Sequence, residues 1–219
     1  MAPLQAYVIS KSFLHRAREL VETSREAGRS IFSPGATALL AIDLERYFTD
    51  PTSHACVPGA AEVLAQIGRL VVAFSDRGLP VFFTRHQNTC ENAGALARWW
   101  DDLILEGSPL SDLAPEVDAS RGIVLAKTQY DAFHATGLEQ ALRERRVTRI
   151  VVTGFVTHLC CETTARSAFV RGFDVTFPVD ATAAYDEEHH VATLLNLGHG
   201  FATLAFVRDV IDAMVEAAG

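Results

Sequence analysis

Two adjacent cysteines, Cys160 and Cys161, stand in the segment GFVTHLCCETTARSAF, directly after an apolar run and where a helix should begin. Cys160 would lie in the first turn, where free backbone N–H groups and the helix dipole favour a thiolate and can hold an oxyanion. Cys161 lies further round the helix and shares a small-residue stripe with Ala165 and Ala168. Although a single cysteine is more often a buried small hydrophobe, we interpret Cys160 as a candidate nucleophile and Cys161 as packing.

Two charged residues each follow an apolar run directly. Asp43 comes after LLAI, and Lys127 comes after IVLA. Either one alone is commonly a strand-end cap or a charge that reaches solvent, because an unpaired buried charge is costly. If both share one rim with Cys160, the aspartate can take the thiol proton and the lysine can hold the carboxylate. That arrangement has the nucleophile, base and orienting group of the serine triad in other residue types.

Short apolar runs that alternate with helix-periodic segments must position these residues. The expected strands cover 37–43, 80–86, 122–127, 149–155, 174–181 and 201–207. The expected helices cover 59–78, 137–147, 157–171 and 186–198, with a short terminal helix after them. This alternation predicts an α/β fold with three α/β/α layers and a central, mostly parallel six-stranded sheet. Ligands bind at the carboxyl ends of such strands. The residues expected there are Asp43, Arg85, His86, Lys127, the segment 154–160 with Cys160, and Asp180.

Residues 1–35 differ from the rest of the chain. Phe13, Ala17, Leu20 and Val21 have helical spacing and are flanked by charged residues. We predict an amphipathic helix that ends near Gly28 and packs on the domain or on a neighbouring subunit. Residues 36–219 are expected to form one domain.

Composition excludes several function classes. The 219 residues carry 27 acidic and 19 basic side chains, a net charge of −8, which argues against a nucleic-acid partner. No apolar stretch is long enough for a membrane span, and no signal peptide is visible. The four cysteines form no C-x-x-C pair. We therefore expect a soluble, cytoplasmic protein.

Four ordered segments resemble the isochorismatase-like cysteine hydrolases, the superfamily of nicotinamidase and N-carbamoylsarcosine amidohydrolase. They are LLAIDLERYF, VLAKTQYDAF, VVTGFVTHLCCETTARSAF and RGFDVTFPVDATA, and the resemblance spans about residues 36–210. It implies a Rossmann-like fold with Cys160 as nucleophile, Asp43 as general base and Lys127 as the orienting residue. It also implies a cis peptide at Phe155–Val156, with the N–H groups of Val156 and Cys160 as the oxyanion hole.

Aromatic and basic residues near the strand ends are candidates for a substrate pocket, although for the aromatics ordinary core packing is an equal alternative. The candidates are Tyr47, Phe48, Arg85, His86, Trp99, Trp100, Tyr130, Phe133 and His158. Arg85 could hold a substrate carboxylate bidentately. We assign His189 and His190, which follow YDEE, to a solvated helix face.

No metal or other cofactor is expected. Nicotinamidases carry a metal-binding aspartate and two histidines between the first two segments of the resemblance. Here Asp50 and His54 are present, but the Asp-x-His spacing is absent.

The resemblance implies a small-molecule substrate and hydrolysis of its amide or carbamoyl C–N bond through a thioester. PLQAYVI, TRH and DEEHH resemble the isochorismatase branch, whose vinyl-ether hydrolysis is the alternative, but that branch lacks a cysteine at the position of Cys160. A catalytically silent interaction subunit is a second alternative. We also expect a homo-oligomer, a dimer or tetramer, as is common in the family.

Overall fold

The computed structural model describes residues 7–26, 32–33 and 35–217. Its centre is a parallel sheet with the order β3-β2-β1-β4-β5-β7, in which β6 pairs with the end of β4. The strands are β1 (Thr37–Ile42), β2 (Val81–His86), β3 (Ile123–Lys127), β4 (Arg149–Phe155), β5 (Asp174–Pro178), β6 (Thr182–Ala183) and β7 (Thr203–Ala205). The expected α/β fold with a central parallel sheet is confirmed.

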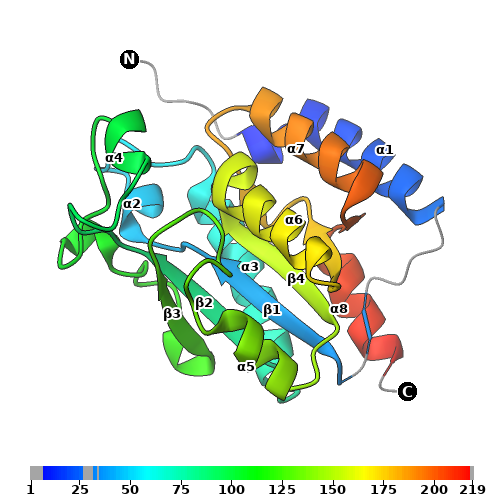
Figure 1. Ribbon diagram of the computed structural model, residues 1–219. Coiled ribbons are helices and arrows are strands. Elements are labelled where there is room, and N and C mark those ends of the chain that lie inside the picture. Colours follow the sequence, from blue (N-terminus) through cyan, green and yellow to red (C-terminus); the bar gives the residue numbers. More distant parts are fainter. Residues whose placement is uncertain (1–6, 27–31, 34, 218–219) are drawn as a thin grey trace.

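Helices cover both faces of the sheet (Figure 1). One face carries α3 (Ala60–Ser75) and α8 (Val207–Glu216), and the other carries α5 (Leu138–Glu144), α6 (Glu162–Val170) and α7 (Glu187–Gly200). The shorter helices α2 (Arg46–Thr49) and α4 (Leu96–Trp99) lie in the loops beyond the carboxyl ends of β1 and β2. Short 3₁₀ turns cover Tyr7–Ile9, Pro109–Ser111 and Ala119–Arg121.

Two expected strands are shorter than their apolar runs. The run 174–181 breaks after Pro178, where Ala181 donates a turn hydrogen bond to the carbonyl of Pro178. The chain then shifts inward and resumes as β6 beside β4. In the run 201–207, Val207 already belongs to α8, and the half-buried Asp180 carboxylate accepts its N–H at 2.8 Å. Asp180 is therefore a structural cap at this edge of the sheet.

Burial is deepest at the middle of the sheet. Every residue of β1 and β4 is buried, whereas Ile123 and Val124 on the edge strand β3 are exposed. The chain runs from β1 outward to β2 and β3, then returns to place β4 on the other side of β1. The switch point of this doubly wound sheet therefore lies between β1 and β4, where such folds bind their ligands.

The N-terminal segment packs on its own domain. Helix α1 (Lys11–Glu26) lies against α7 and β7, and buries Phe13, Ala17 and Val21, with Leu20 half-buried (Figure 1). Its expected end near Gly28 falls outside the described residues. None of the helices in the described ranges has the length and apolar character that crossing a membrane requires.

Candidate active site

The switch point brings together the three residues whose chemistry the sequence suggested. Asp43 follows β1, Lys127 ends β3, and Cys160 lies in the π-helical turn Thr157–Cys161 that follows β4 and leads into α6. All three are buried, and His86 at the end of β2 joins them. The parallel strands thus deliver one titratable group each to the same rim.

Local backbone geometry explains how β1 and β4 approach so closely here. Gly154 pairs with Ile42 and has a φ of 117°, and a Cβ at this position would collide with the carbonyl oxygen of Ile42. Asp43 itself has a φ of 51°, which aspartate tolerates better than most residues. The peptide bond between Phe155 and Val156 is cis. The chain therefore turns sharply on both strands directly before the side chains of the site.

Lys127 is the centre of the cluster. Its Nζ lies 2.8 Å from Oδ2 of Asp43 and 3.3 Å from Sγ of Cys160. It also donates to the carbonyl of Gln129 at 2.8 Å and lies 3.1 Å from Nδ1 of His86. Burial opposes the charge of Lys127, but the Asp43 carboxylate and the other partners outweigh it and hold its pKa above the ordinary range. The ammonium group thus stays charged beside the thiol.

The Cys160 thiol is held in its neutral form. Burial, followed by the negative charge of Asp43, raises its pKa well above the ordinary value, and Lys127 offsets only part of this. The expectation that the helix start favours a thiolate is therefore wrong for the free enzyme, because burial and the charge of Asp43 outweigh the helix dipole. A thiol in this setting needs a base at the moment of attack. Cys161 is wholly buried in the core, as expected for packing.

Asp43 is fixed by a partner that sequence reasoning missed. Thr84 donates its hydroxyl proton to Oδ1 of Asp43 at 2.6 Å and accepts the Asp43 N–H at 3.0 Å. Thr84 and His86 are two residues apart on β2, so they present their side chains to the same face. That period-2 spacing was a usable signal for Thr84.

His86 is held neutral in one tautomer. Its Nδ1 accepts a hydrogen bond from the Lys127 ammonium, so its Nε2–H donates to Oδ1 of Asn88 at 2.9 Å. Burial, then the Lys127 charge, lowers the pKa of His86 to about 4. His86 therefore adds no positive charge to the site at neutral pH.

These residues do not suit a metal ion. Ligand atoms of Asp43, His86 and Cys160 lie within 4.8 Å of one another, but the ammonium of Lys127 is bonded to all three. A cation there would meet a like charge at contact distance. The other two candidates are engaged elsewhere, since Asp50 pairs with Arg46 at 2.7 Å and His54 lies 3.2 Å from Asp102.

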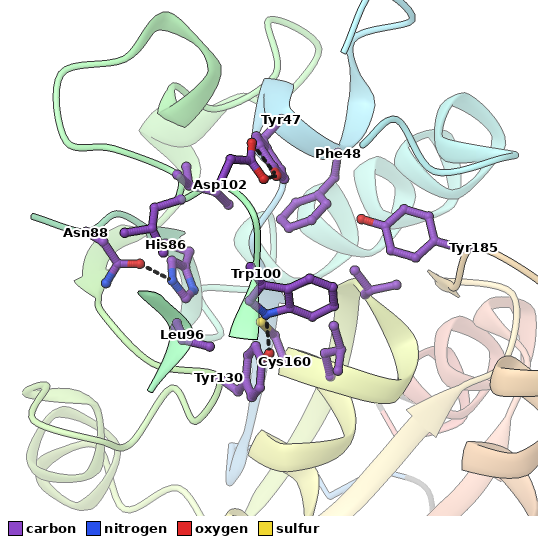
Figure 2. Close-up of a pocket in the computed structure, with 14 residues that line it drawn as sticks. Tyr47, Phe48, His86, Asn88, Leu96, Trp100, Asp102, Tyr130, Cys160 and Tyr185 are labelled. Atoms are coloured by element: carbon purple, nitrogen blue, oxygen red, sulfur yellow. Dashed lines mark hydrogen bonds between the residues drawn. The ribbon is translucent and has the colours of Figure 1, made fainter. Parts of the chain in front are cut away.

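A cavity with aromatic walls opens above Cys160 (Figure 2). It is lined by Tyr47, Phe48, His86, Asn88, Leu96, Trp100, Asp102, Leu103, Ile104, Tyr130, Val156, Leu159, Cys160 and Tyr185. Trp100 donates its indole N–H to the Tyr130 hydroxyl at 2.7 Å, and the Tyr47 hydroxyl donates to Asp102. Within the described part of the chain, the lining contains one carboxylate, that of Asp102, and neither lysine nor arginine.

Five of the nine expected pocket residues line this cavity: Tyr47, Phe48, His86, Trp100 and Tyr130. Sequence reasoning missed Asn88, Asp102 and Tyr185. These residues come from loops whose course no strand or helix pattern predicts.

The other four expected pocket residues point elsewhere, which corrects those assignments. Arg85 alternates with Thr84 and His86 along β2, so its guanidinium lies on the opposite side, 3.4 Å from Asp112. The Trp99 ring is 78% exposed. Phe133 packs in the core, stacked on Phe173 with ring centroids 5.9 Å apart. His158 faces the His189 ring, 4.5 Å away between ring centroids.

His190 is also corrected, since it is wholly buried, whereas the neighbouring His189 is exposed as expected. The two side chains point about 100° apart around α7. His190 therefore faces α1 and the sheet, and His189 faces solvent.

The fold and the cluster define a three-layer α/β protein of the cysteine hydrolase type, and comparisons with known proteins agree. A family model described as the isochorismatase domain matches residues 37–209, and the chain belongs to this family. Nicotinamidase 3 of Arabidopsis thaliana is 38% identical over 172 residues, which cover 76% of this chain and 83% of that protein. The isochorismatase of Bacillus subtilis (strain 168) is 30% identical over 168 residues, 74% of this chain and 52% of that protein.

Solved structures agree as well. A cysteine hydrolase from Pseudomonas syringae pv. phaseolicola 1448A superimposes with a TM-score of 0.79 at 25% identity, covering 86% of this chain and 97% of the other. The family and its homologues indicate a hydrolase of the amidohydrolase kind.

Proposed function

We propose that the protein hydrolyses a C–N bond of a small amide or carbamoyl compound through a thioester on Cys160. The observation that carries this proposal is the position of Lys127, whose Nζ contacts both the Asp43 carboxylate and the Cys160 sulfur beneath a cavity that Cys160 lines. This arrangement provides a nucleophile, its base and a fixed positive charge in one buried cluster at the base of the cavity.

The reaction begins with proton transfer from the Cys160 thiol to the Asp43 carboxylate as the sulfur attacks the carbonyl carbon. Lys127 keeps its proton and stabilises the negative charge that moves between carboxylate and sulfur. The tetrahedral oxyanion is held by the N–H groups of Val156 and Cys160, at the start of the turn after β4. When the C–N bond breaks, the leaving nitrogen takes the proton from Asp43 and departs as ammonia or an amine.

The second half of the reaction reverses these roles. Water enters where the amine left and gives a proton to Asp43 as its oxygen attacks the thioester carbonyl. The C–S bond then breaks, the sulfur takes the proton back from Asp43, and the acid is released. Thr84 holds the Asp43 carboxylate in place throughout, through its 2.6 Å hydrogen bond.

The cavity also favours an uncharged amide over isochorismate. Isochorismate carries two carboxylates, and a site that binds such groups supplies arginine or lysine. The described lining residues include neither arginine nor lysine, and they include the Asp102 carboxylate. His86, which also lines the cavity, is neutral because its pKa is lowered to about 4. Vinyl-ether hydrolysis also has no use for a thiol nucleophile.

The test is a rapid quench of wild-type enzyme with small amides and carbamoyl compounds, followed by intact-mass analysis. We expect an acyl adduct on Cys160, located by peptide mapping, with release of ammonia or an amine. Cys160→Ala is the blank, and Cys161→Ala is the matched control because it removes the adjacent thiol. Efficient turnover of isochorismate that survives in Cys160→Ala, without an adduct, would replace this function by vinyl-ether hydrolysis. Absence of both activities would favour a silent subunit.

A further inference from the structure

Tyr7 precedes the region that the family model matches, yet its hydroxyl is bonded in the interior of the domain. It accepts the backbone N–H of Ala184 at 2.7 Å and lies 2.8 Å from Nδ1 of His190. An amide N–H can only donate, so the hydroxyl proton is directed to His190. His190 Nδ1 is therefore an acceptor, and its Nε2–H faces the hydroxyl of Thr182 at 3.4 Å.

The chemistry of His190 agrees with this assignment. Its side chain is wholly buried between α7, α1 and the sheet. Burial, then the neighbouring His158, lowers its pKa to about 3. The imidazole stays neutral at physiological pH and retains a lone pair for the Tyr7 proton.

Tyr7 thereby holds a segment that reaches the active site. Thr182 and Ala183 pair with Gly154 and Phe155, directly before the turn that carries Cys160. Ala184, which donates to Tyr7, is followed by Tyr185, whose ring lines the cavity (Figure 2). The Tyr185 hydroxyl makes no hydrogen bond to any described residue, so its ring is placed by its backbone and by packing, which includes an edge-on contact with His158 at 6.5 Å between ring centroids.

We propose that Tyr7 is a positioning residue for the substrate pocket, whose hydroxyl fixes segment 182–185 so that Tyr185 forms one wall. Residues 7–26 then help to complete the binding site of a catalytic centre to which they contribute no catalytic group. This inference rests on the proposed function only in taking the cavity above Cys160 as the substrate site.

Tyr7→Phe separates positioning from packing. The Tyr7 ring packs edge-on against Phe13, with ring centroids 5.5 Å apart, and phenylalanine keeps that contact. It removes only the hydroxyl and leaves the buried Ala184 N–H and His190 Nδ1 without their partner. Losing these two hydrogen bonds loosens segment 182–185 and the cavity wall it carries, so we expect KM to rise by about 10-fold with kcat changed by less than about 2-fold.

The matched control is Val21→Ala, which trims a buried α1 residue two turns away from this contact. It should lower the melting temperature at least as much as Tyr7→Phe while leaving KM unchanged. Hydrogen exchange measured by mass spectrometry should accelerate at residues 182–186 in Tyr7→Phe and not in Val21→Ala. This readout needs no substrate, so it stands even if no amide is hydrolysed.

A double-mutant cycle with Tyr185→Ala completes the test. If Tyr7 acts through Tyr185, the KM effect of Tyr7→Phe disappears in the Tyr185→Ala background. Unchanged exchange at 182–186 in Tyr7→Phe overturns the proposal, as does an unchanged KM or a KM effect that persists in the Tyr185→Ala background.

Failure of the proposed function gives a different result, because no amide then yields ammonia or an adduct. The alkylation rate of Cys160 by iodoacetamide then replaces KM, with a change in Tyr7→Phe supporting the proposal and equality with wild type overturning it.

Discussion

Two clusters of polar side chains, one at the carboxyl ends of the strands and one between α1 and α7, differ in charge. The catalytic cluster buries an ion pair, Lys127 with Asp43, whose side chains are both 0% exposed. The cluster between α1 and α7 holds the half-buried Tyr7 and the buried His190 as neutral groups. A buried ion pair is seldom the more stable choice, because both charges lose their hydration. The charged cluster is therefore explained by its chemistry, and the neutral cluster by the packing of the N-terminal segment.

The largest effect should come from the nucleophile and not from its neighbour. We expect Cys160→Ala to abolish turnover and Cys161→Ala to keep most of it, because Cys160 lines the cavity while Cys161 is enclosed in the core. Steady-state ammonia release measures both variants, and circular dichroism confirms that they fold. Equal losses in two folded variants would refute this distinction between the two cysteines.

Removing either member of the ion pair should come next. Asp43→Asn and Lys127→Ala should each lower kcat by about 100-fold or more, the scale for a lost proton-transfer or charge-stabilising group. Each should also destabilise the fold, since the remaining charge is left buried and unpaired.

The double variant Asp43→Asn/Lys127→Met sharpens the comparison between clusters. It removes both charges, so much of the lost stability should return while activity stays low. Urea unfolding and kcat, measured on the same preparations, test this. Recovery of activity in the double variant would contradict a chemical role for the pair.

The two clusters also differ in how far the sequence revealed them. Asp43, Lys127 and Cys160 each follow an apolar strand, and parallel strands bring their carboxyl ends to one rim. Strand positions alone therefore predicted that the three would meet. The hydrogen bond between Tyr7 and His190 joins residues 183 positions apart, and no periodicity in the sequence predicts it.

Side-chain direction was the weaker part of the prediction. Arg85 and His86 both end β2, but alternation sends them to opposite faces, so only His86 lines the cavity. On α7 the same kind of error placed His190 in solvent. The resting charge of Cys160 was also misjudged, because the dipole of a helix start is readable from sequence whereas the burial that outweighs it is not.

A smaller effect should appear in the pH dependence of stability. The pKa of His190 is about 3 in the folded protein and about 6.5 in the unfolded chain, so between these values the unfolded state binds more protons. Above about pH 6.5, His190 is neutral in both states and does not lower the free energy of unfolding. Below that pH, protonation of His190 in the unfolded chain lowers the free energy of unfolding by ~1.4 kcal/mol per pH unit. His190→Gln should therefore show a shallower fall in melting temperature from pH 7.5 to 5 than wild type. The exposed His15→Gln is the control and should follow wild type.

The smallest expected effect is that of a chelator, which should leave activity unchanged. Asp43, His86 and Cys160 form the candidate metal cluster of the described residues, and the Lys127 ammonium is bonded to each of them. A divalent cation would have to displace that ammonium, leaving a buried positive charge without its carboxylate partner. Dialysis against EDTA, elemental analysis and assay of the same sample test this expectation. A stoichiometric metal whose removal abolishes activity would contradict this expectation. It would show that in the active enzyme a metal ion, and not the Lys127 ammonium, supplies the positive charge of the cluster.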